Sequence, residues 1–157
     1  MRSLPQIVAL YEEIDRGFDG DSEAALTAGD QAEAQRIEQK QLVNDQAYFV
    51  LCWGQLEAEI DDACRAAISR RKGDQNWEMR RGFDFYDPTD RRLSGLSFER
   101  RVAIVLDRNG VTGSPWATVI SYYGMRNQVA HGNLAATRID VSRVVQDFYV
   151  IQGALTR

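Results

Sequence analysis

The segment MRNQVAHG, residues 125–132, carries three polar side chains whose types and spacing suit chemistry. Arg126 supplies a permanent cation, Asn127 an amide, and His131 the single imidazole of the 157-residue chain. On an α-helix Asn127 and His131 share one face because they are four residues apart, and the long Arg126 side chain can swing toward them. We therefore expect the three side chains to border one polar pocket at a helix end, where an imidazole exchanges protons near neutral pH.

A purely structural explanation of these residues stays open. A histidine in the last turn of a helix interacts favourably with the helix dipole, an arginine forms surface ion pairs, and an asparagine makes local hydrogen bonds. Two features favour a functional pocket instead. Asparagine has a low helix propensity within a turn, and we expect the apolar Val129 and Ala130 to hold the segment against the rest of the domain.

The hydrophobic pattern predicts that helices position this segment. Apolar residues recur at three- and four-residue steps over residues 4–20, 22–28, 30–71, 94–108, 115–131 and 140–155. Ser114 and Pro115 suit the start of the helix that carries the segment, and Gly132 suits its end. No strand pattern interrupts these helices. We predict an all-α fold, an antiparallel bundle of four to five main helices in a single domain, residues 1–157.

The long helix predicted over residues 30–71 is expected to lie at the centre of the bundle. Asp30 is placed to cap its first turn. One apolar stripe runs along it, made of Phe49, Trp53, Leu56, Ile60, Ala63, Cys64 and Ala67. Cys52 and Cys64 fall within this apolar pattern and are too few for a disulfide framework, so we expect reduced thiols in the core.

Composition and charge narrow the classes of function. The chain is 44% hydrophobic and 27% charged, has no apolar run of roughly 18 residues and no signal-peptide pattern, which predicts a cytoplasmic protein without a membrane segment. Residues 1–64, which include the acidic N-terminal helices predicted within 1–40, hold 4 Lys/Arg against 14 Asp/Glu, whereas residues 65–157 carry a net charge of +6. The pI near 5.0 disfavours general nucleic-acid binding, but a local polyanion site remains open.

Residues 73–93 interrupt the helical period and combine Gly, Asp and Pro with four aromatic side chains, Trp77, Phe83, Phe85 and Tyr86. We expect an ordered loop whose aromatic side chains pack back on the bundle. A second interpretation stays open, because bases stack on aromatic rings while arginines contact phosphates. Under this interpretation, Arg80 and Arg81 are candidate substrate-binding residues, because they lie among Arg91, Arg92 and the aromatic residues. Tyr123, beside the motif, is a third candidate.

The residue inventory excludes several kinds of catalytic site. One histidine does not suffice for an HExxH zinc site, and position 128 is Gln where a di-iron bundle would require Glu. A Gly-rich phosphate loop and a GxSxG motif are also absent from the sequence. The acidic group Glu57, Glu59, Asp61 and Asp62 is typical of a solvated helix face. We therefore expect no metal and no cofactor.

The string RNQVAH, residues 126–131, resembles the Arg-x4-6-His motif of the HEPN superfamily, in which a polar residue such as Asn commonly follows the arginine. Its position is also similar to that in HEPN domains, late in an all-α chain with one more helix after it. The stretch AYFVLCWGQLEAEI, residues 47–60, is similar to the central helix of many HEPN domains. Residues 1–40 and 73–93 have no counterpart in this resemblance.

The resemblance implies a metal-independent endoribonuclease with a toxin or defence role, whose site lies in the cleft of a homodimer. It implies that His131 acts as acid or base, that Arg126 holds the phosphate and that Asn127 orients the imidazole or the scissile group. Single-stranded RNA is the implied substrate, and a cognate antitoxin or another partner protein the implied partner. Two alternatives stay open: a non-catalytic HEPN-like module that binds a partner protein or a nucleotide, and an unrelated bundle whose helix ends in His-Gly.

RNA cleavage of this kind needs more proton-transferring groups than the single imidazole of one chain provides. Cleavage by the 2′-hydroxyl of RNA needs a base, an acid for the 5′-oxygen and positive charge for the transition state. One chain supplies one imidazole. An isologous dimer places the same patch of two copies face to face, which brings two histidines, two asparagines and two arginines into one cleft.

Overall fold

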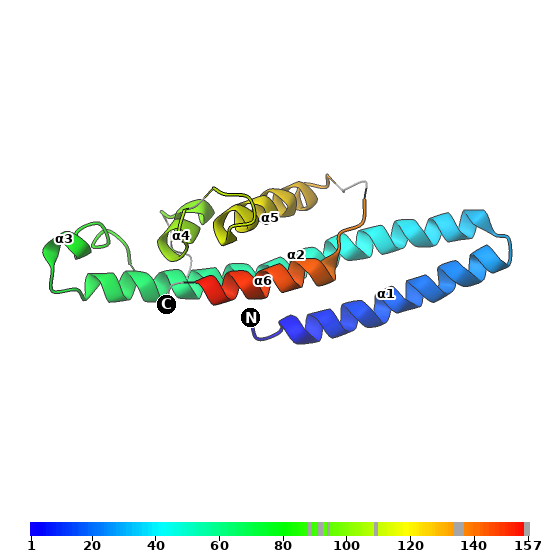
Figure 1. Ribbon diagram of the computed structural model, residues 1–157, viewed down its shortest axis with the longest axis horizontal. Helices are drawn as coiled ribbons and strands as arrows, with labels where there is room; N and C mark the ends of the chain where they lie inside the picture. Colours follow the sequence, from blue (N-terminus) through cyan, green and yellow to red (C-terminus); the bar gives the residue numbers. More distant parts are fainter. Residues whose placement is uncertain (88, 91–92, 94, 109, 134–136, 156–157) are drawn as a thin grey trace. The chain divides into compact units, whose positions relative to one another are not determined.

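The structure, a computed structural model, describes residues 1–87, 89–90, 93, 95–108, 110–133 and 137–155. The regular secondary structure of this part of the chain is entirely helical (Figure 1). Its elements are α1 (Leu4–Thr27), α2 (Gln31–Lys72), α3 (Trp77–Arg80), α4 (Phe98–Val105), α5 (Pro115–Ala130) and α6 (Val141–Ala154). The predicted all-α class is confirmed. None of these helices is long and apolar enough to span a membrane.

The described chain divides into two compact units. Unit 1 comprises Met1–Gln55 and Tyr123–Gln146, and unit 2 comprises Leu56–Tyr122 together with the chain from Asp147 onward. Helices α2, α5 and α6 each contribute residues to both units. The single domain over residues 1–157 stays a prediction.

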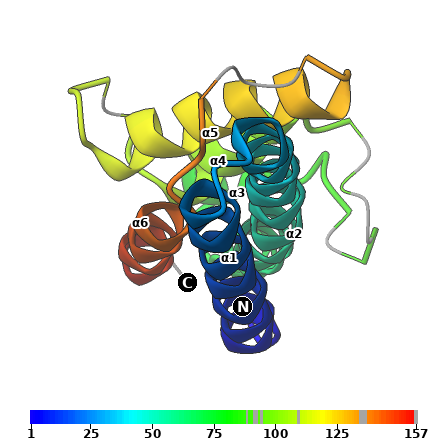
Figure 2. The ribbon, with the colours of Figure 1, turned by 90° about the vertical axis from the view of Figure 1, so that its right-hand side faces the viewer.

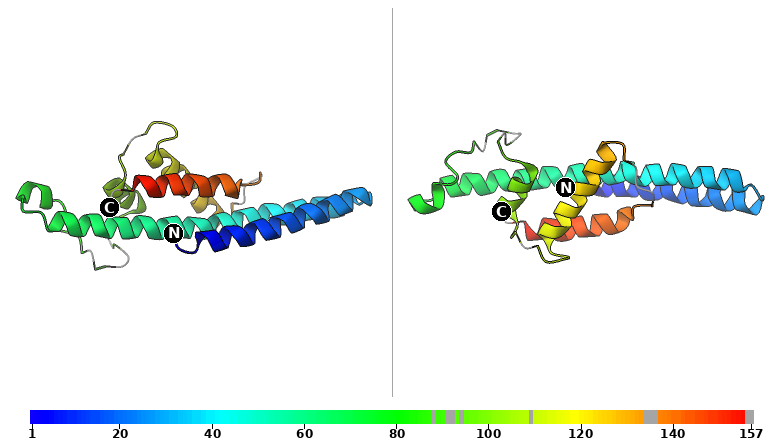
Figure 3. Two further views of the ribbon diagram at one scale, coloured as in Figure 1. Left: turned by 60° about the horizontal axis from the view of Figure 1, so that its bottom comes forward. Right: turned by 90° about the horizontal axis from the view of Figure 1, so that it is seen from above.

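In unit 1, α1 runs antiparallel to the first half of α2 (Figures 2 and 3). The contacts show the direction, because residue numbers rise along α1 while those of their partners fall along α2. The Ser3 amide donates to Gln55 at 3.2 Å, and the Tyr11 and Tyr48 rings lie 5.4 Å apart. Further along α1, Asp19 accepts a hydrogen bond from Gln41 at 2.8 Å. These contacts align the two helices over most of the length of α1.

The predicted break near Gly20 is wrong, since α1 continues to Thr27 and includes the segment expected as a separate short helix over 22–28. A glycine inside a helix costs only about 0.5–1 kcal/mol, and the hydrogen bond from α2 to Asp19 holds the helix at this point. The chain leaves the helix at Gly29, whose φ is +77°. The Gly29 amide donates to Leu26 and the Asp30 amide to Ala25, the two hydrogen bonds of a Schellman motif.

The predictions for α2 are largely confirmed. The Asp30 carboxylate accepts a hydrogen bond from the Glu33 amide at 3.0 Å and caps the first turn. All seven residues of the predicted apolar stripe are buried. The helix ends at Lys72, one residue beyond the predicted end, and its last turn is basic, which suits the negative end of the helix dipole.

Unit 2 packs around the second half of α2. Its buried side chains include Leu56, Ile60, Ile68, Phe98, Val102, Val105, Val119, Phe148 and Ile151. Arg101 on α4 forms ion pairs with Asp61 and with Glu57, the latter at 3.6 Å. Two members of the acidic group on α2 therefore join α2 to α4 and do not form a purely solvated face.

The two C-terminal helices agree with the predicted pattern, whereas α4 is shorter than expected. The Ser114 hydroxyl accepts from the Ala117 amide at 3.2 Å, and Asp140 accepts from the Arg143 amide at 2.8 Å, so both N-caps are formed. The helix predicted over 94–108 begins after its cap residue Ser97 and ends at Val105. It ends there because Leu106 adopts an extended conformation; residue 94 lies outside the described residues.

The expectation that the aromatic side chains of residues 73–93 pack back on the bundle is wrong for two of them. Trp77 is 58% exposed and Phe85 is 90% exposed, whereas Phe83 and Tyr86 are half-buried. Composition alone does not distinguish rings that a loop buries from rings that it displays. Arg91 and Arg92 of this segment lie outside the described residues.

Both cysteines are free and buried, as predicted. Burial raises the pKa of the Cys52 and Cys64 thiols to about 11. At pH 8, on the order of one in a thousand of such thiols is the reactive thiolate. We expect neither thiol of the native chain to react with DTNB within minutes, and both to react in concentrated urea, measured by absorbance. Rapid modification of the native chain would contradict this burial.

Candidate functional site

The second half of α5 carries the candidate site and is held against α2 within unit 1. The ring of Tyr123 stacks on that of Trp53, with centroids 6.1 Å apart and an interplanar angle of 28°. Trp53 is fully enclosed in the core, so this contact fixes the last two turns of α5 on a rigid support. Tyr123 therefore has a packing role; its predicted role in substrate binding stays a prediction.

Arg126 and Asn127 are joined through their side chains. Arg126 Nη1 donates to Asn127 Oδ1 at 3.1 Å, which orients the planar guanidinium. Arg126 is half-buried, and its Nε is buried without a hydrogen-bond partner among the described residues. No described carboxylate pairs with it. A partly buried cation without a counter-ion favours an anionic ligand, since a buried charge is costly unless it is paired.

His131 is the residue that follows α5, and its side chain is exposed. Its backbone amide donates to the carbonyl oxygens of Asn127 at 3.0 Å and Gln128 at 3.2 Å. The imidazole makes no hydrogen bond or ion pair with the part of the chain that the structure describes. The side chains of Arg126 and Asn127 are thus joined, whereas the bond from His131 to Asn127 is the ordinary backbone bond of an α-helix and leaves the imidazole without a hydrogen bond to either.

Gly132 ends the helix immediately after the histidine, as predicted. Its φ of +80° lies in the left-handed region. The Gly132 amide donates to Val129 at 3.0 Å and the Asn133 amide to Gln128 at 2.9 Å, which completes a Schellman motif. This motif sets the direction of the backbone at His131, so the imidazole is carried on an ordered helix end.

Replacing Gly132 with alanine is expected to lower the free energy of unfolding by about 1 kcal/mol, because a Cβ is disfavoured at positive φ. Apart from the two neighbouring residues, no heavy atom of the described part of the chain lies within 4 Å of the added Cβ, so the cost comes from the backbone conformation. Gly124→Ala in the same helix is the matched control. It also has open space and is expected to stabilise the chain by up to about 1 kcal/mol. Urea unfolding measures both, and equal effects of the two changes would contradict the assigned cap.

Arg80 and Arg81 belong to unit 2, whereas the motif residues belong to unit 1. Arg80 Nη1 donates to the carbonyl oxygen of Asp74 at 3.1 Å, and its Nε lies 4.0 Å from Asp84. The Arg81 guanidinium lies over the Trp77 ring, 5.2 Å from its centroid. The two arginines thus differ in kind, since Arg80 supports the loop and Arg81 is stacked on an exposed ring. Their predicted roles in substrate binding stay predictions.

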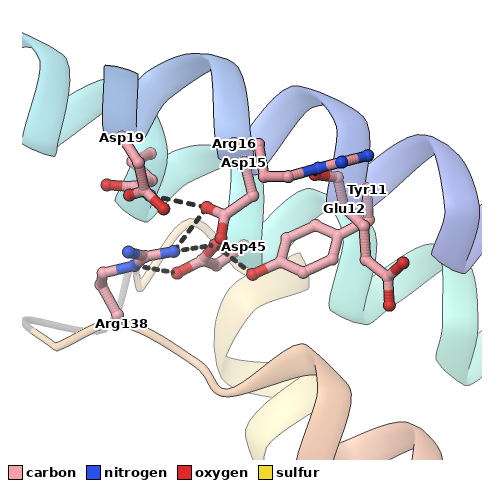
Figure 4. Close-up of polar contacts among 8 residues, drawn as sticks. Tyr11, Glu12, Asp15, Arg16, Asp19, Asp45 and Arg138 are labelled. Atoms are coloured by element: carbon pink, nitrogen blue, oxygen red, sulfur yellow. Dashed lines mark hydrogen bonds and ion pairs between the residues drawn. The ribbon is translucent and has the colours of Figure 1, made fainter. Parts of the chain in front are cut away.

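A polar network around the buried Asp45 in unit 1 has no counterpart among the sequence-based predictions (Figure 4). Asp45 on α2 is fully buried and accepts from the Tyr11 hydroxyl at 3.0 Å and from Arg138 Nε at 2.8 Å. Arg138 also pairs with Asp15, which accepts from Gln41 at 2.6 Å. Burial, reinforced by the Asp45 carboxylate, raises the pKa of Tyr11 well above its usual range. The network ties the chain before α6 to α1 and α2.

One signal in the sequence points to part of this network. Gln41 and Asp45 precede Phe49 at four-residue steps, so they continue the apolar stripe of α2 with polar side chains. A polar residue on a buried face requires a partner. Nothing local identifies Arg138 as that partner, because it lies 93 residues away from Asp45.

A cavity of about 680 Å³ adjoins the network, lined by Tyr11, Glu12, Asp15, Arg16, Arg138, Ile139, Asp140 and Ser142. Both signs of charge line it, so its electrostatics favour neither an anion nor a cation. Among the described residues, no three His, Cys, Asp or Glu side chains gather as a metal site. The chain has one imidazole, so the motif at the end of α5 is the place where a cation, an amide and an imidazole follow one another closely.

No protein-family model, curated protein sequence or solved structure matches this chain.

Proposed function

We propose that this chain is a metal-independent endoribonuclease with a HEPN-like fold, which cleaves single-stranded RNA in a cleft between two copies. One observation carries the proposal. Arg126 is half-buried, is oriented by Asn127 and lacks a carboxylate partner among the described residues, while five residues later His131 presents an exposed imidazole. A cation without a described carboxylate partner, five residues before an exposed imidazole on the same helix end, suits a phosphodiester.

The proposed reaction assigns each side chain a separate part. A base removes the proton of the 2′-hydroxyl, whose oxygen attacks phosphorus. The bond from phosphorus to the 5′-oxygen breaks, and an acid gives that oxygen a proton. The products are a 2′,3′-cyclic phosphate and a 5′-hydroxyl end. His131 acts as the acid or the base, and Arg126 stabilises the charge of the transition state.

Asn127 acts as a positioning residue in this proposal. Its amide oxygen already holds Arg126 at 3.1 Å, so the hydrogen bond fixes the cation before substrate binds. Preorganised charge contributes more to catalysis than charge that must reorient during the reaction. Its orientation of the imidazole or the scissile group remains part of the sequence-based prediction.

The homodimer is part of the proposal because the reaction needs both a base and an acid. One chain has a single histidine, and an isologous interface brings two copies of it into one cleft. A toxin or defence role would require inhibition by a cognate antitoxin or another partner protein. The non-catalytic alternative, a module that binds a partner protein or a nucleotide, predicts no cleavage from the same fold.

The test is an RNase assay of the purified chain with EDTA present. We expect fragments from a labelled single-stranded RNA and none from DNA of the same sequence, which lacks the attacking hydroxyl. Light scattering of the active fraction is expected to give twice the mass of one chain. Intact RNA after prolonged incubation would reject the enzyme and favour the non-catalytic module. Activity that elutes with a monomer would reject the shared cleft.

A further inference from the structure

The connection between α2 and α4 displays aromatic side chains in a way that the proposed catalytic residues do not explain. We call residues 73–87 the aromatic loop. Trp77 and Phe85 project from it with 58% and 90% of their surfaces exposed, and Met79 is 44% exposed. Exposing large rings forgoes roughly 25 cal/mol for each Å² of apolar surface left in water. Three large apolar side chains exposed within one ordered loop suit a surface that contacts a partner.

The loop is held in an ordered conformation that keeps Phe85 outward. Lys72 Nζ donates to the carbonyl oxygen of Tyr86 at 2.8 Å and lies 3.5 Å from that of Asp84, so both neighbours of Phe85 are fixed to the end of α2. The Phe83 amide donates to Arg80 at 2.8 Å, and the Tyr86 amide to Phe83 at 3.1 Å. Consecutive turns therefore connect α3 to Phe85, and the exposed ring stands on a fixed backbone.

Trp77 is fixed at the start of α3 and carries a cation on its ring. The Asn76 side chain caps α3 by accepting from the Glu78 amide at 2.9 Å. The Arg81 guanidinium lies 5.2 Å from the centroid of the Trp77 ring. No described carboxylate pairs with Arg81. The loop therefore presents an aromatic ring together with a cation that lacks a described carboxylate partner.

Cations in the last turn of α2 and in the aromatic loop suit contacts with a phosphate backbone. Arg70 and Arg71 stand in the last turn of α2, immediately before the loop, and neither pairs with a described carboxylate. Asp84 lies beside Arg80, which offsets its charge. Asp87 accepts two hydrogen bonds from Thr89, which lower its pKa but leave it charged. Arg70, Arg71 and Arg81 therefore remain as cations without a described carboxylate partner, and the carboxylates of Asp74, Glu78 and Asp87 stand in the same loop.

We propose that the aromatic loop binds single-stranded nucleic acid. Bases stack on Trp77 and Phe85, and Arg81, Arg70 and Arg71 contact the phosphates. Exposed rings bind unpaired bases through their π-faces, and arginines beside them neutralise the backbone. This binding surface is inferred from the geometry of the loop. Its further role, holding the RNA that the α5 motif cleaves, rests on the proposed function. The proposal assigns no phosphate contact to Arg80, which supports the loop through Asp74 and Asp84.

Fluorescence anisotropy of a labelled oligothymidylate with the full chain tests the surface. DNA is the probe because it cannot be cut by its own 2′-hydroxyl. We expect Trp77→Ala and Phe85→Ala to weaken binding about tenfold each, in line with the loss of one stacked base. Arg81→Ala is expected to lower the slope of log affinity against log salt by about 0.7, the value for one phosphate contact on a single strand. Wild-type binding should also quench Trp77 fluorescence.

Two variants serve as matched controls. Val150→Ala removes an exposed apolar side chain of α6 in unit 2, and Arg36→Ala removes one cation from unit 1; both are expected to keep the wild-type affinity and salt slope. Circular dichroism and urea unfolding confirm that each variant is folded.

The outcomes separate this proposal from the proposed ribonuclease. Absence of binding by the wild type, or wild-type affinity in both Trp77→Ala and Phe85→Ala, overturns the aromatic loop as a nucleic-acid surface. Its exposed rings would then be assigned to a protein partner. A chain that binds oligothymidylate through Trp77 and Phe85 but leaves RNA intact overturns the ribonuclease and supports the surface.

Discussion

His131→Ala is expected to lower the rate of RNA cleavage by about 10²- to 10⁴-fold, the usual contribution of a general acid or base. The free energy of unfolding should change by less than about 0.5 kcal/mol. The side chain is exposed and makes no hydrogen bond with the described residues, so it contributes little to the folded state. Single-turnover cleavage rates and urea unfolding measure the two quantities separately.

Gln128→Ala is the matched control for this change. Gln128 is exposed in the same turn, and its backbone oxygen accepts from His131. Alanine keeps the carbonyl and the helix, so the cleavage rate should stay within about twofold of wild type. If Gln128→Ala lost as much activity as His131→Ala, the loss would come from a disturbed end of α5 and not from the missing imidazole. If His131→Ala cleaved at the wild-type rate, the imidazole would have no part in the chemistry.

Asp45→Ala is expected to lower the free energy of unfolding by about 3 kcal/mol. Removing one partner of a buried charge pair costs about 3–5 kcal/mol. The lower end applies because Arg138 is 44% exposed and keeps its ion pair with Asp15. The Tyr11 hydroxyl, which donates to Asp45 at 3.0 Å, also loses its acceptor. Urea unfolding at pH 7 measures the change.

A double-mutant cycle identifies the origin of this loss. Tyr11→Phe removes one hydrogen bond and should cost about 1 kcal/mol. Asp45→Ala combined with Arg138→Ala should cost less than the sum of the two single changes, because neither then leaves an unpaired charge. The network would not be a stabilising element if the effects of Asp45→Ala and Arg138→Ala on the free energy of unfolding were strictly additive. The same conclusion would follow if Asp45→Ala alone lowered that free energy by less than about 1 kcal/mol.

Local signals in the sequence were sufficient for most of the helices. Asp30 and Ser114 predict their N-caps because an N-cap needs only a side-chain acceptor and the amides two or three residues later. Gly132 predicts the end of α5 for an equally local reason, the preference of positive φ for glycine. The stripe of α2 is visible because burial follows the helical period.

Contacts between distant segments could not be predicted in this way. Gly20 indicates a break from its own propensity, but α1 continues across it alongside α2. Arg138 precedes α6 and has no local pattern that indicates its partner Asp45. In the aromatic loop, Trp77 and Phe85 have the same composition signal as buried rings, and their exposure depends on where Lys72 and Asn76 fix the backbone.

The candidate site shows the same division. Residue types and spacing pointed to Arg126, Asn127 and His131 as candidates, and the helix places them within about one and a half turns at its C-terminal end. The hydrogen bond from Arg126 to Asn127 was not foreseen, since it depends on the rotamers of both side chains. The missing carboxylate partner of Arg126 among the described residues is likewise a property of the folded chain, because it depends on which segments pack around α5.

The chemistry of the RNA ends is the most direct test of the central claim. A single-stranded RNA is incubated with wild type and with His131→Ala in EDTA, and the fragment ends are identified by mass spectrometry. The account predicts 2′,3′-cyclic phosphate and 5′-hydroxyl ends with wild type, and none above background with His131→Ala. Ends bearing 5′-phosphate, cleavage that requires added metal, or identical fragments from both chains would contradict it.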